Sequence, residues 1–220
     1  MKKLRQGRVF AVVLVTALGA SAAYAASPSD INPPPTAKDW ADIAKLPDWS
    51  GVWNVNETWQ NQEITRNPTP WTPKAAKQIA AMLAEEKAGH PRGLYVDCLP
   101  EGMPTWMMIY HNAFEFLFTP GRVTILGETD GNGQRRIFTD GRKHPADPEL
   151  TFYGHSIGHW EGTTLVVDTT GVMPEVRLSI SEAAGVPNNG DMHVVERMHL
   201  VNDGEFHDDL EITAPHVLTK

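Results

Sequence analysis

Cysteine is almost absent from this sequence of 220 residues, in which Cys98 is the single thiol. One cysteine forms no intramolecular disulfide, so a small secreted scaffold held by disulfides is excluded, and a buried, unreactive side chain is the favoured interpretation. The P-loop, the dinucleotide-binding glycine pattern, the G-x-S-x-G nucleophile turn and the zinc-protease helix are missing as well. We therefore expect no nucleotide, flavin, nicotinamide or other cofactor.

A long hydrophobic run is also missing, because the longest one, residues 9–20, is too short for a confident transmembrane helix. It follows four basic residues and precedes Ala23-Tyr24-Ala25, a pattern typical of a signal peptide that ends at residue 25. We assign residues 1–25 to export and expect a periplasmic or secreted protein. Cleavage removes four of the 19 basic residues and none of the 27 acidic ones, which leaves a formal charge of −12. This charge argues against nucleic acid and membrane as partners.

The mature chain reads as a lead-in followed by one domain. Residues 26–47 are proline-rich and predict an extended lead-in, and residues 48–220 form the domain. One helix is predicted over 73–88, with Thr72 as its N-cap and Gly89 at its end. The remaining segments have the pattern of short strands: 48–55, 114–118, 122–126, 135–140, 150–160, 163–168, 192–201 and 205–213.

Tight-turn sequences such as Asp130-Gly131-Asn132-Gly133 separate these strands. About eight strands at this spacing predict an all-β fold, an antiparallel meander that closes into a barrel with one helix at its side. A small barrel can hold one ligand in its mouth. A small aromatic or apolar molecule is thus the expected partner, and the oligomeric state is left open.

The strand 192–200 places one carboxylate on an apolar face. Its even-numbered residues are apolar except for Glu196, and its odd-numbered residues include His193 and Arg197. If the even face is the interior, desolvation favours protonated Glu196 unless a cation pairs with it, and such a group can act as general acid or base. A buried structural Glu–Arg pair and a solvated glutamate are the alternatives that the sequence leaves open.

Residues 139–168 are unusually rich in histidine, glycine and charged side chains. His155 and His159 point the same way on one predicted strand, but about 13 Å of strand separates them, too far to bind one metal directly. A metal site needs three or four ligands in one place, so we assign none and favour a neutral imidazole as proton shuttle. His144 and His193 are candidate neighbours.

Two further stretches are candidates for the site. Asp140, Arg142 and His144 lie in a turn after a strand, where Arg142 either is solvated or holds an anionic or phenolic oxygen at the barrel mouth; we favour the second. Residues 99–110 are rich in methionine and aromatic side chains, and they form either core or the lining for a flat apolar ligand. Trp106 and Tyr110 belong to this stretch.

Three segments carry a resemblance to a known family: RIFTDGRKHP (136–145), GHSIGHWEGTTLVVDT (154–169) and HVVER (193–197), with WSGVW at 49–53. Over residues 98–213 the chain resembles a family of exported bacterial proteins from sphingomonads and acidobacteria. The resemblance implies a lipocalin-like, calycin-type barrel and a role in the catabolism of plant-derived aromatics, including lyases that open aryl ethers such as lignin phenylcoumaran dimers. Many relatives continue into an aromatic-containing tail beyond the position of Lys220, so we do not carry over the contacts that such a tail supplies.

We expect a cofactor-independent lyase that acts by acid–base catalysis on a small aromatic or cyclic apolar substrate. Glu196 and His155 are the expected acid–base pair, and Trp106 and Trp160 would stack on the ring. The other predicted site residues would hold the phenolate or assist: Arg142, Arg197, Tyr110, His144, Asp140 and His159. The alternatives are a periplasmic carrier of an apolar ligand and a metal-dependent hydrolase, which requires three of His144, His155, His159 and His193 to meet.

Overall fold

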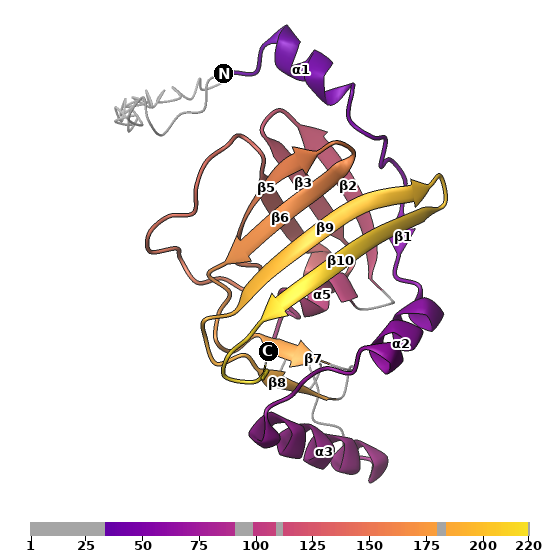
Figure 1. The fold of residues 1–220 in the computed structure, drawn as a ribbon, viewed down its shortest axis with the longest axis vertical. Helices are drawn as coiled ribbons and strands as arrows, with labels where there is room; N and C mark the ends of the chain where they lie inside the picture. Colours follow the sequence, from indigo (N-terminus) through magenta and orange to yellow (C-terminus); the bar gives the residue numbers. More distant parts are fainter. Residues whose placement is uncertain (1–33, 91–98, 109–111, 180–183, 220) are drawn as a thin grey trace, which may run out of the picture. The chain divides into compact units, whose positions relative to one another are not determined.

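The computed structural model describes residues 34–90, 99–108, 112–179 and 184–219 (Figure 1). The predicted signal peptide at 1–25, the first part of the predicted lead-in, Cys98 and Tyr110 lie outside these residues. No helix within the described ranges is long and apolar enough to cross a membrane. Residues from Pro35 onward belong to one compact unit, to which the description below refers.

One sheet of eight strands is the body of this unit. Figure 1 shows it curling on itself, with β9 and β10 crossing in front of β2 and β3. The sheet is a nearly closed barrel, which confirms the predicted all-β, lipocalin-like fold. Its strands, in spatial order, are β1 (Trp53–Asn54), β2 (Ala113–Thr119), β3 (Arg122–Gly127), β4 (Gln134–Phe138), β5 (His155–Glu161), β6 (Thr164–Thr170), β9 (His193–Asn202) and β10 (Glu205–Thr213).

One pair of neighbouring strands in this sheet departs from the predicted antiparallel meander. β4 and β5 are parallel, and they pair through Ile137 with Ser156 and Phe138 with Ile157. A parallel pair needs a connection that returns along the strands, and here the loop 139–154 makes it, projecting beyond the sheet in Figure 1. The prediction of antiparallel pairing throughout was wrong here, because a strand pattern does not encode strand direction.

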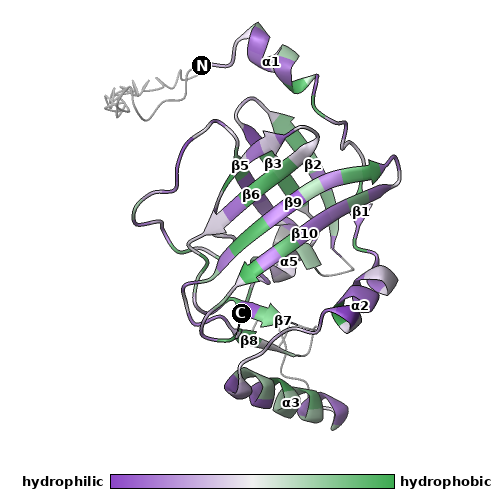
Figure 2. Cartoon of the chain, in the orientation of Figure 1, coloured by the Kyte–Doolittle hydropathy of each residue, from purple (hydrophilic) through white to green (hydrophobic). Residues whose placement is uncertain are grey.

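Alternation of buried and exposed residues sets the register of the barrel. Phe114 and Phe116 of β2 are buried, whereas Leu117, which follows Phe116 and precedes Phe118, is exposed. On β9, Val194, Glu196 and Met198 are all fully buried, so the even-numbered face is the interior. Figure 2 shows hydrophobic and hydrophilic residues following one another along β9 and β10, as expected for strands with one face in the core.

The predicted helix is confirmed as α3 (Pro73–Lys87), with Thr72 accepting a hydrogen bond from the amide of Ala75 at 3.3 Å. Its buried residues are Ala75 and Ile79, four positions apart on one face of the helix. The lead-in is not wholly extended: Thr36 and Asp39 form a capping box at the start of α1 (Ala37–Ile43).

Several short elements were not predicted. α2 (Glu57–Arg66) begins at the N-cap Asn56 and buries none of its residues, and α5 (Thr105–Met108) lies before β2. The predicted β-turn at 130–133 is instead a helical turn, α6 (Thr129–Asn132), although it joins the antiparallel strands β3 and β4 as expected. A separate hairpin of β7 (Arg177–Ser179) and β8 (Gly185–Pro187) lies between β6 and β9 in the chain. The first predicted strand shrinks to Trp53–Asn54.

A tryptophan fills the barrel toward each end. Trp106, fully buried, packs edge-on against Phe114 at the start of β2, with ring centroids 5.0 Å apart. Trp49, only 1% exposed, packs against Phe118 at the other end of β2, at 5.3 Å. The interior polar groups described next come from strand positions between these two indoles.

Candidate functional site

Strands β5, β6 and β9 carry polar residues on both of their faces. Ser156, Thr169 and Glu196 point into the barrel, where all three are buried. The residues adjacent to them in sequence point outward, because side chains alternate along a strand: His155 on β5, Asp168 and Thr170 on β6. The result is an inner and an outer polar cluster separated by one layer of backbone.

Arg135 of β4 is the centre of the inner cluster, and it is 1% exposed. Its guanidinium donates to Glu196 through Nη1, at 2.8 Å, and also through Nη2. It donates further to the hydroxyl oxygens of Thr169, at 2.9 Å, and Ser156, at 3.1 and 3.2 Å. Of the alternatives for Glu196, the structure has the buried Glu–Arg pair.

Asp208 of β10 adds a second carboxyl group to this interior. Its strand pairs it with Met198, so it lies on the same face as Glu196. Both of its carboxyl oxygens are inaccessible to solvent and make no hydrogen bond within the described part of the chain. Burial, and then the neighbouring Glu196 carboxylate, raise the pKa of Asp208 well above its usual range, while Arg135 opposes this shift.

The outer cluster links three histidines and one aspartate. His144, from the loop 139–154, places its Nδ1 2.8 Å from Nδ1 of His155 and its Nε2 2.9 Å from Oδ1 of Asp168. His193 of β9 contacts the same Asp168 oxygen at 3.0 Å, and the hydroxyl of Thr170 is 3.3 Å from Nδ1 of His144. These side chains are partly exposed, so the cluster is accessible from solvent.

The hydrogen bonds determine where protons lie in this chain of groups. Asp168 can only accept, so Nε2 of His144 carries a proton. Nδ1 of a neutral His144 then has a lone pair, and His155 must donate to it through its own Nδ1. The lone pair of His155 is thereby left on Nε2, for which the described residues provide no hydrogen-bond partner. The cluster thus exposes one basic nitrogen supported by an aspartate through a second imidazole.

Arg142 brings a positive charge to the same face. Its guanidinium carbon lies 3.8 Å from the centre of the Phe138 ring, and that ring stacks on His155 with centroids 5.5 Å apart. Asp140 accepts from Nε of Arg142 at 2.9 Å and also from Nη2. The N–H groups of Nη1 have no protein acceptor within the described ranges, so they remain available to an anionic oxygen.

Burial favours the neutral form of His155. Burial, followed by nearby positive charge such as that of Arg142, holds the pKa of His155 below its ordinary value of 6.5. At pH 7 its imidazole therefore retains the lone pair on Nε2. A neutral, partly exposed imidazole beside an arginine has the properties of a general base with an adjacent anion-binding group.

The structure brings some of the predicted site residues together and separates others. Asp140, Arg142, His144 and His155 are neighbours, but Glu196 lies on the opposite side of the sheet from His155. His159 and Arg197 lie apart from this group and both contact Glu161, at 3.2 and 2.8 Å. Glu196 and His155 therefore do not converge on one substrate.

The two predicted stacking residues are also separated. Trp106 is enclosed between Phe114 and Tyr153, at 5.0 and 5.1 Å. Trp160 points into the other end of the barrel, where it packs against Trp49 at 5.2 Å. The role expected of Tyr110 concerns a residue outside the described ranges.

Sequence reasoning missed Arg135, Asp168 and Asp208. The sequence did contain a signal for Asp168. It follows Leu165, Val166 and Val167 on β6, and because side chains alternate along a strand, it points away from the face on which Leu165 and Val167 are buried. In the parts of the chain that the structure describes, no group of three His, Cys, Asp or Glu side chains is arranged to hold a metal ion. Comparison of the chain with protein-family models, curated proteins and solved structures gave no match.

Proposed function

We propose that the outer cluster is the active site of a cofactor-independent carbon–oxygen lyase that acts on a small aromatic ether. His155 is the base and Arg142 binds the oxygen that leaves. The observation that supports this proposal is the chain Asp168–His144–His155, which ends in an unpaired Nε2. Export through the predicted signal peptide remains a prediction, and it would place the reaction outside the cytoplasm.

The role of the relay is to stabilise charge on the base. When Nε2 of His155 takes a proton, the imidazolium donates through Nδ1 to His144, which in turn donates to Asp168. The carboxylate stabilises the new positive charge through this relay without accepting a proton itself. Because Asp168 also accepts from His193, its orientation is fixed from two sides.

The proposed reaction is an elimination. Nε2 of His155 removes a proton from the carbon next to the one that bears the ether oxygen. The electrons of the broken C–H bond form a C=C bond, and the C–O bond breaks with its electrons passing to oxygen. The phenolate binds Nη1 of Arg142 and takes the proton back from His155, so that the products are an alkene and a phenol and no co-reactant is consumed. In a cyclic ether the ring opens and the product is an isomer of the substrate.

Racemic phenylcoumaran-type lignin dimers are the substrates with which to test the proposal. The purified protein is incubated with them without added metal or cofactor, and the products are followed by chiral chromatography and mass. We expect loss of one enantiomer to an isomeric phenol. His155→Gln should lower turnover by about 10²–10⁴-fold, because that is the usual contribution of a positioned base.

His159→Gln is the matched control, since His159 lies on the same strand and face but contacts only Glu161. It should retain the turnover of the unaltered protein. Equal losses in both variants would remove His155 from the proposed role. Binding of the dimers without any conversion would instead favour a carrier.

A further inference from the structure

Trp49 occupies the barrel end as an inserted side chain and not as part of a strand. It comes from the entry segment, defined here as residues 44–52, which contains no helix or strand residues. Its ring is surrounded by four aromatic rings, with centroids 4.8 to 5.3 Å away: Phe116, Phe118, Trp160 and Phe206. These rings form an aromatic box that accepts a flat molecule of the size of an indole.

The indole fits the box but leaves its own polar group unsatisfied. Nε1 of Trp49 is buried and makes no hydrogen bond in the described structure. A buried donor without a partner costs free energy. In the described structure, the surroundings of Nε1 of Trp49 are thus apolar and offer the indole N–H no acceptor.

The box continues inward along β10 to a buried carboxyl group. Asp208 lies two residues from Phe206 on β10, and both point into the barrel. Its two buried oxygens are without partners in the parts of the chain described. The interior therefore combines an aromatic wall with one carboxyl group that a ligand hydroxyl could pair with.

Apart from the Trp49 ring, the entry segment makes few hydrogen bonds to the barrel. Nε1 of Trp53, on β1, donates to the carbonyl oxygen of Trp49 at 3.0 Å. The amide of Ser50 bonds within the segment, to Asp48 at 2.9 Å. Within the described residues, no backbone hydrogen bond joins 47–52 to a barrel strand. Segments with few backbone hydrogen bonds open at low cost.

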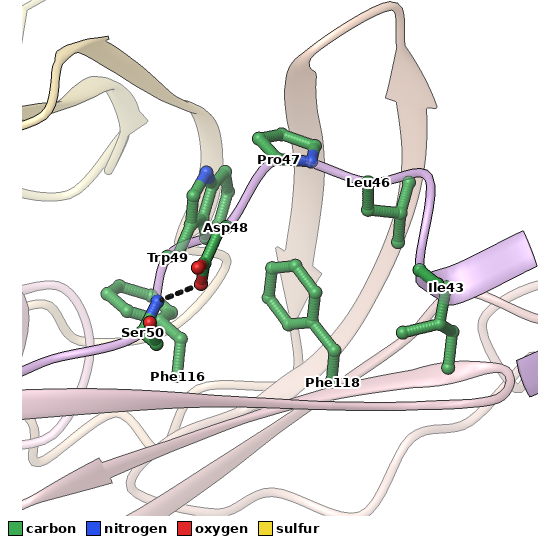
Figure 3. Close-up of a pocket in the computed structure, with 9 residues that line it drawn as sticks. Ile43, Leu46, Pro47, Asp48, Trp49, Ser50, Phe116 and Phe118 are labelled. Atoms are coloured by element: carbon green, nitrogen blue, oxygen red, sulfur yellow. Dashed lines mark hydrogen bonds between the residues drawn. The ribbon is translucent and has the colours of Figure 1, made fainter.

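A pocket adjoins the inserted indole. It measures about 340 Å³ and lies between the entry segment and β2. Figure 3 shows Leu46, Pro47 and Asp48 across from the rings of Phe116 and Phe118, which also belong to the aromatic box. This volume lies in the range of small-molecule sites, and the pocket leads to Trp49 from outside.

We propose that the barrel end is a second binding site, distinct from the outer cluster, for a small planar phenol that displaces Trp49 and hydrogen-bonds to Asp208. Trp49 is the occupant of the ligand-free protein, and the entry segment moves outward when the phenol enters. The proposal does not depend on lyase activity, because none of its residues belongs to the outer cluster.

The probes are 4-ethylphenol and ethylbenzene, which have the same shape with and without a hydroxyl. An apolar hole binds ethylbenzene more tightly, because burying an unpaired hydroxyl is costly. With Asp208 as partner the order reverses, and we expect 4-ethylphenol to bind more tightly by calorimetry. Saturation should shift the Trp49 indole N–H resonance, assigned with Trp49→Phe.

Variants separate displacement from simple filling of space. Trp49→Ala should bind 4-ethylphenol at least tenfold more tightly, because no side chain has to be expelled. Trp40→Ala is the matched control, since Trp40 is half exposed on α1, and it should leave the affinity unchanged. Asp208→Leu should restore the preference for ethylbenzene, and Asp208→Asn, which keeps the shape and a polar group, should not.

Three results would overturn the proposal. The first is tighter binding of ethylbenzene, or no binding of either probe, by the unaltered protein. The second is a Trp49 resonance that stays in place at saturation. The third is an affinity of Trp49→Ala no higher than that of the unaltered protein. The ligand-order comparison needs no substitution, so it remains decisive if a variant fails to fold.

Discussion

Replacing the buried Arg135 by methionine should lower the free energy of unfolding more than replacing an exposed arginine by methionine. The substitution removes the cation that neutralises Glu196 and leaves two carboxyl groups, Glu196 and Asp208, in a buried interior. Breaking a buried ion pair by removing one partner costs about 3–5 kcal/mol. Ser156 and Thr169 add little to this loss, because their hydroxyls remain bonded to each other at 2.8 Å.

Arg136→Met is the matched control, because Arg136 follows directly on β4 and is exposed. Its free energy of unfolding should stay within about 0.5 kcal/mol of that of the unaltered protein. Urea unfolding of the three proteins at pH 7 gives both differences. The loss in Arg135→Met should shrink as pH falls, because a buried carboxylate avoids its penalty by taking up a proton. A loss below about 1 kcal/mol for Arg135→Met would refute the assignment of this pair to a sealed interior.

Three further changes test the two clusters and the packing around them. Arg142→Gln removes one of the charges that lower the pKa of His155, so the acid limb of kcat/KM for the proposed lyase should move up toward 6.5; an unmoved limb contradicts the role of Arg142. Asp208→Asn removes a carboxyl group whose pKa is raised in the folded state. Above about pH 4 the unfolded chain releases the proton of this group, whereas the folded protein still holds it. Stability of the unaltered protein should therefore fall with rising pH, by about 1.4 kcal/mol per unit until the folded pKa is passed, and this slope should flatten in the variant, as read from unfolding curves at several pH values. Gly127→Ala directs a methyl group to within 2.3 Å of the Trp106 ring and should cost about 1–3 kcal/mol in urea unfolding, whereas Gly204→Ala, with space around it, should cost about 0.5 or less.

Much of the barrel could be predicted because its signals are local. The alternating phenylalanines of β2, the even–odd pattern of β9 and the Thr72 cap of α3 each depend on a few neighbouring residues. α2 gave no such signal, because it buries no residue and so has no apolar stripe. The parallel pairing of β4 with β5 depends on where the loop 139–154 returns, which no local pattern specifies.

The site was harder to predict because face and partner are set by register. Arg135 and Arg136 are adjacent and alike in sequence, yet one is sealed in the barrel and the other is in solvent. His155 and Glu196 looked like a pair, but a shift of one residue along a strand exchanges the two faces of a sheet. His144 and His155 could be proposed as neighbours, whereas their connection to Asp168 and His193 required the pairing of β6 with both β5 and β9.

The two polar faces of β5, β6 and β9 have a consequence for how this chain can change. A strand that covers a hydrophobic core usually has one outward face on which substitutions are tolerated freely. Here each of the three strands is constrained on both faces, inward by the Arg135 bonds and outward by the histidine bonds. Single-residue insertions or deletions in these strands should be far less tolerated than in β2 or β3, whose outward residues take part in neither cluster.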